Sequence, residues 1–247
     1  MASTSETGNA KNVANFDELI SSVTGYGSTY NPSKKSIQVV ELKKLSELAQ
    51  KALKHTNAML PAYSNAVAER EAAIEPLSKL VTRLLNSLKA TDATEQVIDN
   101  AKTIVRKIQG TRATPKKSEE EKAALAAEGK ETKEISTSQM SYNNRLDNFD
   151  KLIQLLASVP SYTPNETELK VETLQAYYDD LVVKNAAVLA AATPLSNSRI
   201  TRDTVLYAPD SGLVDIATDT KNYIKSIFGA GSPQYKQVSK LAFKTVK

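Results

Sequence analysis

The residues that most often carry out chemistry are scarce in this chain. His55 is the only histidine among the 247 residues, and there is no cysteine. A two-histidine metal site needs more than one histidine, and disulfides, thiolate catalysis and sulfur-based zinc sites all need cysteine. His55 lies in the polar stretch KHTN. We therefore interpret it as a solvated helix residue.

Carboxylates are plentiful, but their surroundings do not favour acid–base catalysis. Glu69, Glu71 and Glu75 form one group, and Asp179 and Asp180 form another. A glycosidase-like pair needs two carboxyl groups that face each other across a cleft, with one of them desolvated. These acids stand among lysines and arginines on helix faces that we expect to be solvated. The sequence therefore predicts no catalytic pair.

Two glycine-containing segments are candidate phosphate sites, GYGSTY from Gly25 and GAGS from Gly229. Neither follows a predicted strand or completes a P-loop or a dinucleotide-binding motif, so we interpret both as turns. The sequence thus predicts a protein that is not an enzyme, with no cofactor, no metal site and no small-molecule substrate.

The C-terminal segment combines basic and aromatic residues. From residue 221 to the end the chain has six lysines and no acid, although the whole chain is nearly balanced, with 32 Lys and Arg against 28 Asp and Glu. Lysines neutralise phosphates and aromatic rings stack on bases, so nucleic-acid binding is one reading. A solubilising tail and a contact with an acidic neighbouring subunit are the others. The candidate interaction residues are Tyr235, Lys236, Lys240, Phe243 and Lys244.

Helical periodicity dominates the rest of the chain. Apolar residues recur at spacings of three and four from Val39 to Leu88, and again from Val171 onward. Pro61, Pro76 and Pro194 each predict a kink or a break, and at the first of them we favour a kinked helix over a hairpin.

Two shorter helices are predicted over residues 94–108 and 212–228. Gly110 follows the first and Gly229 follows the second, and glycine is a common helix terminator. We expect each short helix to fold back on its own long helix.

Two phrases in the sequence resemble each other: NFDELISSVTGYGSTYNP from Asn15 and NFDKLIQLLASVPSYTP from Asn148. Further matches follow in the same order, such as PLS at residues 76–78 and 194–196, and TR at residues 82–83 and 201–202. We interpret them as an internal duplication. The alternative is that two unrelated amphipathic helices share common helix patterns.

These patterns predict an all-α protein. The expected architecture is an elongated helical bundle of two tandem, duplicated units with long kinked helices and a short extended C-terminal arm. The predicted segments are a disordered N-terminus (1–12), helical repeat 1 (13–110), a charged connector (111–137), helical repeat 2 (138–230) and a basic C-terminal arm (231–247).

Three segments, SYTPNETELKVETLQAYYDDL, GSPQYKQVSKLAFK and SYNNRLDNFDKLI, resemble helical proteins of Bacteroidota-type bacteria that have no assigned function. The resemblance covers mainly the second half of the chain. It implies a bacterial origin but no activity, cofactor or catalytic residue.

With no catalytic constellation, the sequence favours a structural or scaffold protein that self-associates through long amphipathic helices, as a homo-oligomer and as a filament or lattice subunit. The alternatives are a nucleic-acid-binding module that uses the C-terminal segment, and a helical pore-forming toxin component. No signal peptide or membrane span is evident, which predicts a cytoplasmic location.

Overall fold

A computed structural model describes residues 7–111 and 140–244. Within these residues every regular element is a helix and none is a strand. The all-α prediction is thereby confirmed. The predicted charged connector (111–137) lies outside the described residues, apart from its first residue.

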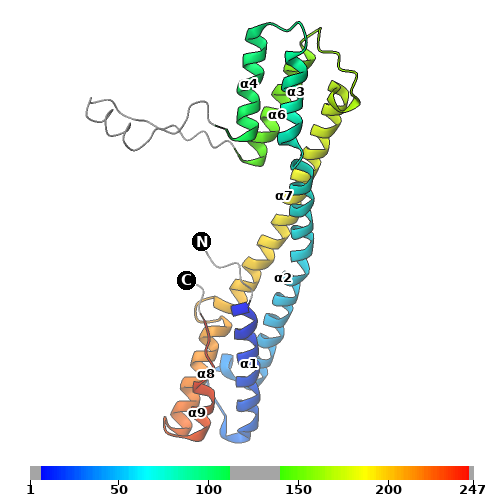
Figure 1. Cartoon of the computed structure of the whole chain (residues 1–247). Coiled ribbons are helices and arrows are strands. Elements are labelled where there is room, and N and C mark those ends of the chain that lie inside the picture. Colours follow the sequence, from blue (N-terminus) through cyan, green and yellow to red (C-terminus); the bar gives the residue numbers. More distant parts are fainter. Residues whose placement is uncertain (1–6, 112–139, 245–247) are drawn as a thin grey trace, which may run out of the picture. The chain divides into compact units, whose positions relative to one another are not determined.

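The helices differ widely in length (Figure 1). Short 3-10 turns, η1 (Gly27–Thr29), η2 (Lys35–Ile37) and η3 (Thr167–Leu169), lie before the two longest helices. The α-helices are α1 (Thr7–Gly25), α2 (Val39–Ile74), α3 (Leu77–Lys89), α4 (Glu95–Gln109), α6 (Tyr142–Ala157), α7 (Val171–Tyr207), α8 (Leu213–Phe228) and α9 (Pro233–Ser239).

The chain forms two compact units. Unit 1 consists of Met1–Ser64 and Ala190–Lys247, and unit 2 consists of Asn65–Leu189. These units do not coincide with the predicted repeats 13–110 and 138–230. Helix α1 packs on α8 in unit 1, and α4 packs on α6 in unit 2, so each unit joins helices from both predicted repeats. The sequence shows apolar stripes on several helices, but only packing decides which stripes meet.

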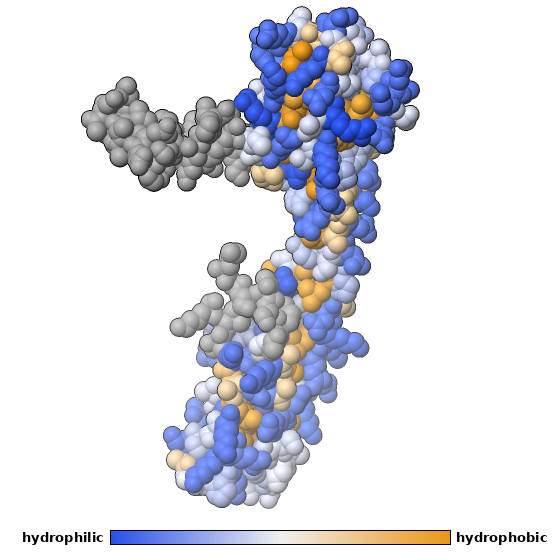
Figure 2. All heavy atoms as spheres, in the orientation of Figure 1, coloured by the Kyte–Doolittle hydropathy of each residue, from blue (hydrophilic) through white to orange (hydrophobic). Residues whose placement is uncertain are grey.

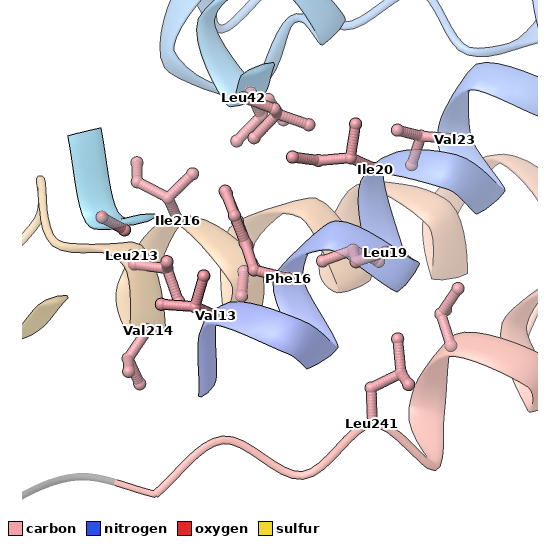
Figure 3. Close-up of a cluster of buried hydrophobic side chains, with 14 of the residues drawn as sticks. Val13, Phe16, Leu19, Ile20, Val23, Leu42, Leu213, Val214, Ile216 and Leu241 are labelled. Atoms are coloured by element: carbon pink, nitrogen blue, oxygen red, sulfur yellow. The ribbon is translucent and has the colours of Figure 1, made fainter. Parts of the chain in front are cut away.

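The core of unit 1 is built around α1 and α8 (Figure 3). Phe16 and Leu19 of α1 are fully buried, as are Leu213 and Ile224 of α8. Leu42, at the start of α2, reaches the same cluster. Since each fully buried side chain of this size stabilises the fold by about 1.5–3 kcal/mol, this cluster fixes α1 against α8.

The core of unit 2 is a separate cluster formed by α3, α4, α6 and the first part of α7. Phe149 of α6 and Leu84 of α3 are fully buried, and the ring of Phe149 meets Tyr177 edge-on at a centroid distance of 5.7 Å. The predicted fold-back of helix 94–108 is partly right, because α4 packs on α3 and also on α6.

The prolines act differently from one another. Helix α2 continues through Pro61 and α7 continues through Pro194, whereas α2 ends at Ile74 and α3 begins after Pro76. The predicted run from Val39 to Leu88 is therefore two helices. Pro76 occupies the N-cap position of α3, where proline's missing N–H removes no helical hydrogen bond.

Both chain ends depart from the prediction. Residues 7–12, placed in a disordered N-terminus, form the first turns of α1. Residues 233–239, placed in an extended arm, form α9, whose N-cap Ser232 accepts a hydrogen bond from the Tyr235 N–H at 3.1 Å. Polarity suggested solvated ends, but tertiary hydrogen bonds and apolar anchors hold both segments on unit 1.

The same local arrangement precedes each long helix. Tyr30 donates a hydrogen bond from its hydroxyl to the Ile37 carbonyl at 2.7 Å, and Tyr162 donates one to the Leu169 carbonyl at 2.9 Å. In both cases the tyrosine is buried and its acceptor lies seven residues later in a 3-10 turn.

Candidate interaction site

The five residues singled out near the C-terminus fall into two groups. Lys236, Lys240 and Lys244 are exposed. Tyr235 and Phe243 are half-buried and pack against the core of unit 1. The lysines are therefore available to a partner, while both rings lie against the protein and do not form a free stacking surface.

Two asparagines of α1 hold the segment that follows α9. The Asn12 side chain donates to the Lys244 carbonyl at 2.8 Å and accepts from the Lys244 N–H at 2.9 Å. Asn15 donates to the Ala242 carbonyl at 2.7 Å. One amide thus pairs with both main-chain groups of one residue, as a neighbouring β-strand would. We call residues 241–244 the C-terminal strap.

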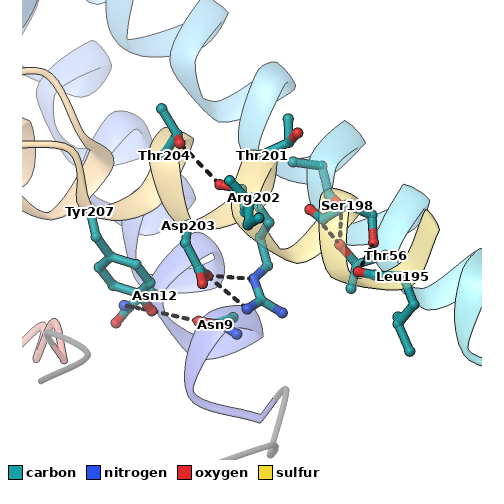
Figure 4. Close-up of polar contacts among 12 residues, drawn as sticks. Asn9, Asn12, Thr56, Leu195, Ser198, Thr201, Arg202, Asp203, Thr204 and Tyr207 are labelled. Carbon is teal, nitrogen blue, oxygen red and sulfur yellow. Dashed lines mark hydrogen bonds and ion pairs between the residues drawn. The ribbon is translucent and has the colours of Figure 1, made fainter. Parts of the chain in front are cut away.

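Asn12 is fully buried, and a second set of contacts fixes its orientation (Figure 4). Its Nδ2 also donates to the Tyr207 hydroxyl at 3.2 Å, and that hydroxyl donates to Asn9 Oδ1 at 2.5 Å. Buried amides are costly unless they are hydrogen-bonded. Because its partners come from α7 and from the strap, Asn12 joins three parts of the chain.

The last turns of α7 carry a buried arginine beside this network (Figure 4). Arg202 is 6% exposed, and its guanidinium donates through Nε and Nη2 to Asp203 Oδ1 at 2.9 and 2.7 Å. Arg83, which the sequence match aligned with Arg202, is exposed and pairs with Glu168 at 2.6 Å. The two arginines therefore have different roles.

Two of the six C-terminal lysines contact the chain's own groups. Lys221 Nζ lies 4.9 Å from the Phe243 ring and donates to the Leu241 carbonyl, and burial lowers the pKa of Lys221. Lys225 Nζ lies 5.8 Å from the Tyr235 ring. These cation–π contacts secure the strap and α9.

Asn12 and Asn15 were not predicted as site residues. A signal was present, because asparagines at positions 9, 12 and 15 recur every three residues and therefore share one face of a helix. When several asparagine side chains lie on one helix face, they can bind the main chain of a neighbouring segment, whereas isolated asparagines give no such indication. The prediction of a disordered N-terminus concealed this periodicity.

The candidate catalytic residues of the sequence all lie at exposed positions. His55 is exposed on α2, and Glu69 pairs with Lys184 at 2.9 Å. In the part of the chain that the structure describes, no group of three His, Cys, Asp or Glu side chains is arranged to hold a metal ion.

Several hollows of unit 2 lie beside α3, and we describe two of them. One, of about 720 Å³, has mostly polar walls that include Asn86, Ser87 and Thr163. The other, of about 600 Å³, is more apolar and includes Leu80 and Tyr177. Arg83 lines both.

The middle of each long helix lacks charge. Residues 56–68 of α2 and 185–198 of α7 contain no Asp, Glu, Lys, Arg or His, although 24% of the chain is charged. Thr56 donates to the Ser198 carbonyl at 3.3 Å within unit 1. Figure 2 shows apolar surface over the long helices among polar surface. Large apolar side chains on or beside the α7 stretch are also exposed, at 63% for Val183, 62% for Leu189 and 62% for Ile200.

Among the described residues, no helix combines the length and the apolar character needed to cross a membrane. No family model, curated protein or solved structure matches the chain.

Proposed function

We propose that this protein is a non-enzymatic helical scaffold that self-associates through the charge-free stretches of α2 and α7, residues 56–68 and 185–198. The observation that carries the proposal is the absence of charge on helix faces that are open to solvent. Exposed helix faces ordinarily carry charged side chains, and contiguous uncharged, partly apolar surface is typical of interaction sites.

Several exposed residues within these stretches are small. Ala58 and Ala62 on α2 and Ala187 and Ala190 on α7 are exposed, and alanine permits the backbones of two helices to approach closely. Charged side chains at such positions would lose hydration on contact with another helix. The chain therefore offers surfaces on which a second copy can pack without burying an unpaired charge.

We further propose that the chain arose by internal duplication. The paired tyrosine contacts, Tyr30 to Ile37 and Tyr162 to Leu169, support this origin, as does the complete burial of both Phe16 and Phe149. A duplicated chain carries two related surfaces. If a contact between copies does not close into a ring, it propagates as a filament or lattice.

Light scattering coupled to size-exclusion chromatography tests self-association over a series of protein and salt concentrations. We expect oligomers whose mass rises with protein concentration. Ala62→Lys and Ala190→Lys should each weaken association at least tenfold, because assembly would bury an unpaired ammonium group. Lysine is a good helix former, so circular dichroism should stay unchanged.

Ala72→Lys is the matched control. Ala72 is exposed on α2, outside the charge-free stretch and next to Glu71, so the same substitution there should leave association unchanged. A wild-type protein that stays monomeric at every concentration and salt would overturn the proposal. Equal weakening by all three substitutions would show that the charge-free stretches are not the contact.

A further inference from the structure

We propose that the face of α1 that carries Asn12 and Asn15 is an acceptor site for the C-terminal strap of a second copy of this chain. In the structure the chain's own strap occupies this face. The proposal rests on the self-association proposed above and adds a second contact, through which copies are linked by exchange of residues 233–244.

Recognition of the strap is directed at its main chain. Asn12 pairs with the N–H and the carbonyl of Lys244, Asn15 donates to the Ala242 carbonyl, and Lys221 donates to the Leu241 carbonyl. None of these bonds depends on whether the strap belongs to the same molecule. The strap of another copy would make the same bonds and leave no buried group unpaired.

Apolar anchors supply the remaining affinity and the specificity. Val238 of α9 is fully buried and Leu241 is 7% exposed. Figure 3 shows Leu241 directed from the strap toward α1, on the side of Phe16 and Leu19. A guest segment therefore needs apolar residues three positions apart, followed by an extended stretch. The C-terminus of another copy meets this requirement without change.

The connection between α8 and α9 is suited to exchange. Helix α8 ends at Phe228, and Gly229 has φ +87° with open space around the position of a Cβ. Gly231 follows and is also unobstructed. Because glycine adopts many backbone conformations, these residues can redirect α9 without disturbing α8. Exchange of a terminal element about such a hinge is a low-cost route to association.

The balance between the two states depends on concentration. The strap makes the same bonds whether it docks on its own chain or on another copy. The monomer with its own strap docked is therefore favoured only by the high effective concentration of that strap. Raising the protein concentration favours exchange. Since donor and acceptor are different surfaces of one chain, the contact is heterologous and can extend from copy to copy.

Disulfide trapping tests the proposal in the full-length chain, which has no cysteine of its own. Asn15→Cys and Ala242→Cys are made as separate proteins, mixed at a concentration that supports assembly, refolded together from denaturant and oxidised. Asn12 retains its bonds to Lys244 in both variants. We expect a disulfide-linked heterodimer of the two variants, with a yield at least tenfold higher than in the control mixture.

The control mixture pairs Ala14→Cys with Ala242→Cys. Ala14 is exposed and adjacent to Asn15 in sequence, but its side chain points in a direction about 100° around the helix axis from that of Asn15. Leu241→Asp, added to the Ala242→Cys protein, should abolish the heterodimer because it places a charge at a buried anchor.

The double variant Asn15→Cys/Ala242→Cys, made as one chain, completes the test. If the mixture gives no heterodimer while the double variant forms only an intramolecular disulfide, the strap binds its own chain and the exchange is overturned. A double variant that forms no disulfide overturns the docked strap as well. After either of these negative results, assembly seen by light scattering would leave the scaffold proposal standing. A protein that is monomeric at every concentration would refute the scaffold proposal as well.

Discussion

At the scale of single residues, buried polar side chains act as tertiary connectors in this protein. Asn12 and Thr56 are fully buried, and each bonds to main-chain groups far away in the sequence: Asn12 to Lys244 and Thr56 to Ser198. Such bonds contribute little net stability when made, but a lost partner leaves a buried group unsatisfied. Their main effect is therefore to specify which segments lie together.

Asn12→Ala should destabilise unit 1 by about 1–3 kcal/mol, because the Lys244 N–H and carbonyl would lose their partner at a partly buried position. Urea denaturation followed by circular dichroism measures the change. Asn15→Ala removes a single bond at a more exposed position and should cost about 0.5–1.5 kcal/mol. If both substitutions cost the same, the paired amide geometry of Asn12 has no special role.

Two tyrosines, one buried and one partly buried, should ionise late. Burial raises the pKa of Tyr30 and of Tyr177 to about 12, and the pKa of each would be 10.0 without it. A folded-state pKa above the unfolded value gives stability that is complete below pH 10 and is lost as the pH rises toward 12. Alkaline conditions should therefore unfold the protein through these groups.

Absorbance at 295 nm, followed against pH, counts ionised tyrosines among the ten in the chain. Tyr30→Phe and Tyr177→Phe should each remove one late-ionising group and flatten the dependence of stability on pH between 10 and 12. One common titration step near pH 10 for all tyrosines in the folded protein would contradict the prediction.

At the scale of elements, the two long helices tolerate interior prolines. Pro61 lies inside α2 and Pro194 inside α7, where proline removes an N–H donor and crowds the preceding turn. A helix keeps such a residue when its flanking turns are held by other contacts. In α2 the Thr56 bond to Ser198 lies before Pro61.

Pro61→Ala should raise the free energy of unfolding by about 2 kcal/mol. Alanine is favoured over proline in a helix interior by about 3 kcal/mol, and the greater freedom of the unfolded chain offsets part of this gain. Thermal and urea unfolding measure the change. Pro233→Ala is the control, because Pro233 begins α9, a position that suits proline, and its replacement should give no such gain.

At the scale of the whole molecule, the chain has two cores that each draw on both halves of the sequence. Unit 1 unites the two ends of the chain, and unit 2 contains its middle. Phe16 belongs to the first core and Phe149 to the second. Each core therefore depends on contacts between helices from different predicted repeats, and neither repeat is expected to fold as an isolated fragment.

Phe16→Ala and Phe149→Ala should each cost about 3–5 kcal/mol, the usual range for removal of a fully buried phenylalanine. Hydrogen exchange with mass spectrometry should show faster exchange in α1 and α8 for the first variant and in α4 and α6 for the second. If Phe16→Ala instead loosened α3 and α4, which belong to the predicted first repeat but to unit 2, the division into these units would be wrong.

The sequence by itself determined the helical class and many helix ends. Apolar spacing, Gly110 and Gly229 located α4 and α8, because the signals that start and stop a helix lie within a few residues of its ends. The structure confirms that Gly110 ends α4 with φ +70°. Pro76 was predicted to give a kink or a break, and in the structure it separates α2 from α3.

Only the tertiary structure decided which helices share a core and how the chain ends are held. Asn12 and Lys244 are 232 positions apart, and no local pattern relates them. The apolar stripes of α1, α4, α6 and α8 are alike in sequence, so periodicity cannot choose their partners. That choice depends on complementary packing between distant segments, which is a property of the folded chain rather than of any stretch within it.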